Sequence, residues 1–321
     1  MMQIVLVGLG AGAASALLFA SVASGSLLSI LLFYLAPLPI MIAALGWSHW
    51  AALIAAAGAA LALGTAFGSI FFFIAFMIGI GLPAWWLGYL AMLARDDSGT
   101  GEHVEWYPAG RLVLWCATIA AGMIIIAIPN FGLDEEQFRA GLRSAFERVL
   151  RQQTGAPAGS PLETRNIDSK RLIDFLATVI PLAAAVLATI TNSVNLYLAG
   201  RIVRVSGRLR RPWPDLSDMR FPGAAHAAFA VALAVSFLPG LIGSAAAIVS
   251  AAMMMAYGIL GFSVLHAVTR QNRGRVFILT GAYFAVLVIG WPILLMTLIG
   301  LADAIFDFRA RFAKGPPPAT T

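Results

Sequence analysis

Charged side chains are spaced very unevenly along the chain, and the intervals between them are apolar. The first Asp, Glu, Lys or Arg is Arg95, so residues 1–94 form an almost unbroken apolar segment. Further charge-free runs extend over residues 112–133, 175–200, 221–269 and 276–302. Since about 20 apolar residues cross the ~30 Å hydrocarbon core of a bilayer, these runs predict membrane-spanning helices.

Glycine, proline and serine interrupt the long runs and indicate where one span ends and the next begins. The runs 112–133 and 175–200 hold one span each. The first run is long enough for four spans, with breaks near residues 24–25, 46–48 and 64–68. We therefore expect about five spans before residue 130.

The number of spans in the last two runs decides on which side of the membrane the chain ends. Residues 221–269 hold two spans that meet at Pro239-Gly240. Residues 276–302 hold either one tilted span or two short spans hinged at residues 290–292. The total is about eight to ten spans, with nine as the central count. Two short spans would return the basic C-terminal end to the side of the N-terminus, which is the arrangement we expect.

Helices are predicted throughout the membrane, because lipid offers no partner to backbone N–H and C=O groups. Runs such as residues 70–76 do not alternate apolar and polar side chains as barrel strands do. The predicted fold class is therefore all-α: a polytopic transmembrane helical bundle with one interfacial amphipathic helix. Closely spaced small residues favour tight helix packing, as in the series Gly8, Gly10 and Gly12 and the pair Gly64 and Gly68.

The predicted amphipathic helix covers residues 134–153. Asp134 is a suitable N-cap, with Gln137 three residues later. One face of this helix is apolar and consists of Phe138, Leu142, Phe146, Val149 and Leu150. We expect this face to lie on the membrane surface, and a lid docked over a cavity is the alternative.

Composition agrees with a membrane protein. Hydrophobic residues make up 60% of the chain and charged residues only 11%, against ~25% charged in soluble domains. The single cysteine, Cys116, excludes an internal disulfide and a cysteine-based metal cluster. The expected parts are N-terminal transmembrane helices in residues 1–129, an extramembrane connection in 130–170, C-terminal transmembrane helices in 171–308, and a disordered tail in 309–321.

Arginine is concentrated after the 175–200 span, in a segment that we call the arginine loop (residues 201–220). It contains Trp213 together with Arg201, Arg204, Arg208, Arg210, Arg211 and Arg220. Because short basic loops face the cytoplasm, we expect this loop and residues 270–275 to be cytoplasmic and residues 130–171 to lie outside. Trp213 and the five arginines before it are candidates for contact with the lipid surface or with a partner. Attraction to anionic lipid explains them without nucleic acid.

Few residues indicate catalysis or a cofactor. The glycines at residues 8–12 lack the βαβ unit and the acidic residue of a dinucleotide site. Four acidic residues and one histidine lie close together between Asp96 and Glu105. Carboxylates there could hold a divalent ion beside a lipid phosphate. Their spacing matches no metal motif, so we predict no metal, no cofactor and no catalytic residue. A metal-dependent lipid-modifying enzyme is kept as an alternative.

The 175–200 span is the most polar of the predicted helices, and Pro181 could kink it. Its uncharged polar side chains are Thr178, Thr189, Thr191, Asn192, Ser193, Asn195 and Tyr197. Such side chains either bond to neighbouring helices or line a polar cavity. Under the second interpretation, the ligand-binding candidates are Thr191, Asn192, Asn195 and Tyr197.

Two stretches carry a family resemblance. One is Trp-Tyr-Pro-Ala-Gly-Arg at residues 106–111. The other is Asn-Leu-Tyr-Leu-Ala-Gly-Arg at 195–201, followed by Pro-Trp-Pro-Asp-Leu at 212–216 and by Phe221-Pro222. Over nearly its whole length the chain resembles the YybS-like family of bacterial polytopic membrane proteins of unknown function. That family is distantly similar to substrate-capture subunits of energy-coupling-factor vitamin transporters and to small cell-shape membrane proteins. The resemblance implies a helical bundle with a small-molecule pocket, and it supplies no catalytic residues.

The favoured hypothesis is a non-enzymatic, multi-pass protein of the bacterial cytoplasmic (inner) membrane. It would bind a small molecule, in a transport-related role, or a membrane-protein partner. A polar span inside an otherwise apolar protein motivates this hypothesis. The first alternative is a scaffold for envelope assembly that docks a partner through the arginine loop or the 134–153 helix. The second is the lipid-modifying enzyme that uses the loop from Asp96 to Glu105.

Overall fold

The computed structural model describes residues 1–96, 104–132, 134–154 and 169–309. Within these ranges the chain is almost wholly helical, and 7 helices are long and apolar enough to cross a membrane. This confirms the all-α, polytopic helical class. The described exception is an antiparallel hairpin of β1 (Ala94–Asp96) and β2 (Val104–Trp106). Strands of three residues leave too short a pattern to be predicted.

Four spans occupy the first apolar run, as predicted. They extend over Met2–Ser24, Leu27–Gly46, His49–Ala66 and Ile70–Ala91. The helices are α1 (Met2–Ala20), α2 (Leu27–Tyr34), α3 (Pro37–Gly46), α4 (His49–Ala66), α5 (Ile70–Phe76) and α6 (Leu82–Ala91). A serine hydroxyl caps the N-terminus of three of these helices, at Ser26, Ser48 and Ser69. The breaks therefore follow local capping chemistry that the sequence already shows.

The C-terminal part consists of longer and shorter helices. They are α7 (Ala109–Ala127), α9 (Ser169–Val205), α10 (Gly223–Val235), α11 (Gly240–Val268), α12 (Arg275–Ile289) and α13 (Ile293–Phe306). Two of the breaks are made by glycines with positive φ, Gly240 at +88° and Gly290 at +83°. Residues 276–302 thus form two short helices instead of one tilted span. Gly290 allows the turn between them, because a residue with a side chain would be strained at this positive φ.

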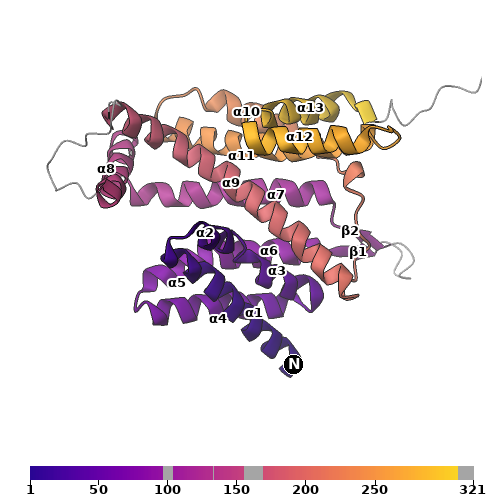
Figure 1. The fold of residues 1–321 in the computed structure, drawn as a ribbon, viewed down its shortest axis with the longest axis horizontal. Helices are drawn as coiled ribbons and strands as arrows, with labels where there is room; N and C mark the ends of the chain where they lie inside the picture. The colour runs from indigo at the N-terminus through magenta and orange to yellow at the C-terminus, as the bar shows by residue number, and fades with distance from the viewer. Residues whose placement is uncertain (97–103, 133, 155–168, 310–321) are drawn as a thin grey trace, which may run out of the picture.

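Helix α9 joins two layers of the molecule (Figure 1). It contains 37 residues and is therefore about 55 Å long, well beyond the predicted 175–200 span. Helices α1–α6 form one layer and α7 with α10–α13 the other, and α9 crosses diagonally from the second layer to the first (Figure 1). It packs on α3 in the first layer and on α7 and α11 in the second.

Helix α8 (Glu135–Thr154) is the predicted amphipathic helix. Asp134 caps it, because its Oδ1 accepts the Gln137 N–H at 2.7 Å. The apolar residues Phe138 and Leu142 are buried in a cluster with residues of α7, α9 and α11. A hydrogen bond adds to this docking: Glu135 Oε2 accepts the Gly240 N–H at 2.7 Å. This part of the apolar face thus packs on the bundle, where we had expected lipid.

Close helix packing depends on selected glycines. An added Cβ at Gly12 would lie 2.7 Å from the Ala55 carbonyl oxygen of α4, and one at Gly8 would meet Ile54 and Ala51. Gly10 has open space beside it, so the predicted series reduces to two packing glycines four residues apart. Gly68 is a turn glycine with φ +59° and open space beside it, whereas a Cβ at Gly64 would crowd Phe73.

Candidate functional site

Several basic segments lie together at one end of the bundle. Arg270 Nη2 is 3.3 Å from Asp215 Oδ2, and Arg220 Nη1 is 2.8 Å from Asp307 Oδ1. Arg211 donates to the Ala91 carbonyl at the end of α6, at 3.0 Å. The arginine loop therefore contacts the α11–α12 connection, the end of α13 and the end of α6.

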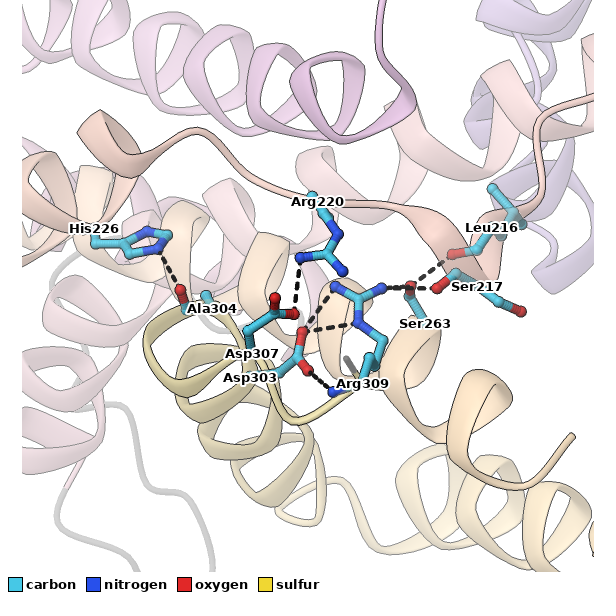
Figure 2. Close-up of polar contacts among 9 residues, drawn as sticks. All are labelled: Leu216, Ser217, Arg220, His226, Ser263, Asp303, Ala304, Asp307 and Arg309. Atoms are coloured by element: carbon cyan, nitrogen blue, oxygen red, sulfur yellow. Dashed lines mark hydrogen bonds and ion pairs between the residues drawn. The ribbon is translucent and has the colours of Figure 1, made fainter. Parts of the chain in front are cut away.

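The end of α13 is fastened to the arginine loop by a buried network (Figure 2). The Arg309 Nε lies 2.8 Å from Asp303 Oδ2, and Arg309 Nη1 donates to the Ser217 carbonyl at 2.8 Å. Ser263 of α11 donates to the Leu216 carbonyl at 2.6 Å. The described chain thus ends on the same side as the arginine loop, which is the arrangement expected for two short final spans.

A cavity of about 120 Å³ lies behind the arginine loop. Helix α7 contributes Leu112 and Cys116 to its wall, and α9 contributes Ser193 and Tyr197. The loop forms the roof with Leu209, Arg211, Trp213, Pro214, Leu216 and Met219. The walls are mainly apolar, and residues of α3 and α6 close the side toward the other layer.

Trp213 anchors the roof of the cavity. Its indole packs edge-on against the Tyr197 ring, with 5.4 Å between the ring centroids. Gly200 makes room for it, since a Cβ there would lie only 3.2 Å from Trp213 Cζ3. The guanidinium groups of Arg201 and Arg204 lie 5.7 and 5.3 Å from the indole centroid, within the range of cation–π attraction. The flanking prolines restrict the backbone on both sides.

Five arginines of the arginine loop have no acidic partner among the described residues. Arg201, Arg204, Arg208, Arg210 and Arg211 form no ion pair with any carboxylate in the described part of the chain. Arg208 lies over the Trp47 ring instead, 4.6 Å from its centroid. Desolvation by the surrounding chain lowers the pKa of Arg211 from its usual value. This end of the bundle therefore presents an uncompensated positive charge.

The four ligand candidates of α9 are placed differently from one another. Tyr197 lines the cavity. Asn195 is buried, and its Nδ2 donates to the Tyr34 and Thr191 carbonyls, both at 2.8 Å. Asn192 is also buried, and its Nδ2 has no hydrogen-bond partner among the residues that the structure describes. The structure therefore does not bring Thr191, Asn192 and Asn195 to the cavity, and a ligand role for them stays a prediction.

The acidic segment between Asp96 and Glu105 is described only at its two ends. Arg95 of β1 pairs in register with Glu105 of β2, and Asp97, Glu102 and His103 lie outside the described residues. Where the structure describes the chain, it holds no group of three or more His, Cys, Asp or Glu side chains that could bind a metal. His226 bridges the Tyr257 hydroxyl, at 2.9 Å, and the Ala304 carbonyl, at 3.0 Å, so it is a packing residue. Figure 2 draws its contact with Ala304.

Sequence reasoning missed several residues of the cavity. Cys116, Ser193, Leu209 and Met219 come from three distant segments. Cys116, Leu209 and Met219 do not differ locally from residues that face lipid or the core, so no sequence signal marks them. Ser193 belongs to the polar set of the 175–200 span but was not among its four ligand candidates. Arg211 and Trp213 were expected at the membrane surface, and the structure shows that they also line the cavity.

The fold and the cavity together define a polytopic helical membrane protein with a small apolar cavity under a basic loop. A family model described as "Predicted membrane protein (DUF2232)" matches residues 13–304. The chain belongs to this family, which confirms the resemblance to a membrane protein family of unknown function. No curated protein and no solved structure matches the chain. The similarity to energy-coupling-factor subunits therefore stays a prediction.

Proposed function

We propose that the protein binds a small molecule in the cavity beneath the arginine loop, as a non-enzymatic component of the bacterial cytoplasmic membrane. One observation carries this proposal: mainly apolar walls line a half-open cavity of about 120 Å³ under a roof that includes the cation Arg211. Binding sites in proteins combine apolar walls with a few polar groups that orient the ligand. Ser193 and Tyr197 supply further polar groups at this site.

A binding role is favoured over a catalytic one by the residues around the cavity. The side chains that line it in the described chain include no carboxylate and no histidine, so they offer no acid–base pair. The guanidinium of Arg211 holds its charge at any physiological pH. These groups suit recognition of a ligand.

We infer that the end with the arginine loop faces the cytoplasm. The loop, the Arg270–Arg275 connection and Arg309 all lie at this end. Arginine-rich short connections are retained on the cytoplasmic side during insertion. The opposite end carries α8, whose charged side chains are of both signs.

The test is the release of a bound compound from the purified protein. The protein is extracted in a non-ionic detergent and denatured, and the organic extract is analysed by mass spectrometry. Ser193→Leu places extra volume in the cavity, whereas Thr178→Leu changes an exposed position of the same helix. The two hydroxyls are matched, because each donates to the carbonyl four residues earlier, Ser193 at 2.8 Å and Thr178 at 3.0 Å.

We expect the wild type and Thr178→Leu to release the same compound in equal, stoichiometric amounts, and Ser193→Leu to release little of it. Thermal unfolding of each variant shows whether it is folded. Equal release from Ser193→Leu and the wild type, or no compound from any of the three, contradicts binding in this cavity.

A further inference from the structure

We propose that the ligand of this cavity is an anionic amphiphile, whose acidic head binds Arg211 and whose hydrocarbon chain lies between α7 and α9. The inference rests on the proposed function and adds the chemical class of the ligand. A free fatty acid and an anionic membrane lipid share this chemistry. The two sources can be separated by experiment.

The charge of the arginine loop indicates that the ligand is an anion. Five arginines, at 201, 204, 208, 210 and 211, form no ion pair within the described chain, whereas Arg220 pairs with Asp307. The nearby carboxylate of Asp215 is bound to Arg270. Crowding of like charges is unfavourable and is relieved by a bound anion. Guanidinium groups bind carboxylates and phosphates through two parallel hydrogen bonds.

Position distinguishes Arg211 from the other four. It is half-buried and lines the cavity, whereas Arg210 beside it is exposed and does not line it. Within the described part of the chain, the Arg211 guanidinium makes one hydrogen bond, to the Ala91 carbonyl at 3.0 Å. A guanidinium has five N–H donors, so the group retains donors for a ligand.

The shape and the chemistry of the walls indicate a hydrocarbon chain. Leu112, Val113 and Leu196 supply apolar surface below the roof. The cavity of about 120 Å³ is smaller than the ~300–1,000 Å³ of pockets that enclose drug-sized ligands. The carbons next to the acidic head of a slender chain fit this volume and these apolar walls, and the open side of the cavity leaves room for the rest of the chain.

The experiment compares matched probes in phosphatidylcholine nanodiscs that contain the full chain. Oleate carries the acidic head, and oleyl alcohol is its uncharged counterpart. A third sample contains phosphatidylglycerol in the nanodisc in place of added oleate. The shift of the thermal unfolding midpoint reports occupancy of the cavity in each sample. Equilibrium binding of radiolabelled oleate and oleyl alcohol gives a second measure.

We expect oleate, and not oleyl alcohol, to raise the unfolding midpoint. Arg211→Gln should raise the half-saturating oleate concentration at least about tenfold, the effect of one lost hydrogen bond to a charged group. Arg210→Gln should change it less than about twofold, as an exposed charge does. A higher midpoint in phosphatidylglycerol discs without oleate identifies a membrane lipid as the source, and a shift by oleate alone identifies a free acid; both support the class.

Arg211→Gln also removes the bond to Ala91, so a second variant keeps all charges in place. Ser193→Leu should abolish the oleate-dependent thermal shift, and Thr178→Leu should keep it. Equal effects of oleate and oleyl alcohol, or of Arg210→Gln and Arg211→Gln, would overturn this proposal and leave the proposed function standing. If no probe raises the unfolding midpoint and no compound is released, both proposals fail.

Discussion

Arg309 and Asp303 form a buried ion pair at the end of α13, with Nε and Oδ2 2.8 Å apart. Only 8% and 1% of the two side chains are exposed. Burial of two charges is costly unless further hydrogen bonds satisfy them. Here the Arg309 backbone N–H donates to Asp303 Oδ1, and Nη1 reaches the Ser217 carbonyl. The pair thereby connects the last described helix to the roof of the cavity.

Removal of one member of this pair should destabilise the protein strongly. Arg309→Ala leaves the Asp303 carboxylate buried without a partner, which costs about 3–5 kcal/mol in comparable buried pairs. The measurement is the free energy of unfolding in detergent micelles. The control is Arg220→Ala, which breaks the half-exposed pair with Asp307 and should cost less than about 1 kcal/mol. Similar losses in the two variants would show that Arg309 is no more important than a surface charge.

Helices α11 and α13 touch through glycines, which gives a second prediction. A Cβ at Gly261 would overlap the Met296 carbonyl, so Gly261→Ala should force the helices apart and cost about 1–3 kcal/mol. Gly281→Ala in α12 is the matched control, because no atom lies within 4 Å of its Cβ position. Thermal unfolding of the two variants measures the difference. An unchanged midpoint for Gly261→Ala would contradict the close approach.

Asp215 gives the arginine loop a stability that depends on pH. Hydrogen bonds from Ser217, and then the charges of Arg270 and Arg275, hold the pKa of Asp215 below its usual value. A lowered pKa in the folded state stabilises the fold above the pKa of the unfolded state, and this contribution is lost as the pH falls through the lowered value.

Asp215→Asn should therefore melt below the wild type at pH 7, and the gap should close toward acidic pH. Thermal midpoints measured at intervals between pH 7 and pH 3 test this. A gap that is constant over this range would mean that the carboxylate charge is not the stabilising group.

A substitution at Asn195 tests the prediction that polar side chains of α9 bind the ligand. Asn195→Leu removes the bond to the Tyr34 carbonyl, so it should cost about 1–3 kcal/mol of stability. If Asn195 acts only in packing, the thermal shift produced by oleate should persist in the folded variant. Loss of that shift, with the protein still folded, would restore Asn195 as a ligand residue.

The side of the C-terminal end can be measured directly. A reporter fused after Thr321 should indicate the same side as one placed before Met1. Arg309 contacts the Ser217 carbonyl of the arginine loop, and an even number of spans leads from Met1 to this loop. A reporter inserted between Gly290 and Pro292 should lie on the opposite side. Reporters after Thr321 and before Met1 on opposite sides would exclude two short final spans.

Much of the helical arrangement follows from the sequence alone. Uncharged runs predicted the spans, and the breaks at residues 24–25, 46–48 and 239–240 fall at helix boundaries in the structure. These features depend on local physics: the apolar length needed to cross a bilayer, serine caps, and glycines that adopt positive φ. The start of α8 at Asp134 is likewise a local hydrogen bond.

Only the tertiary structure decided where the site lies. Arg211 and Arg210 are neighbours of identical type, and just one of them lines the cavity. Gly12 packs against α4 while Gly10 meets open space. Phe138 packs on the bundle, although its pattern equally suited lipid. These outcomes depend on which distant segments meet. In a membrane protein, lipid and protein interior are equally apolar, so hydrophobicity fixes which segments cross the membrane but not which faces touch.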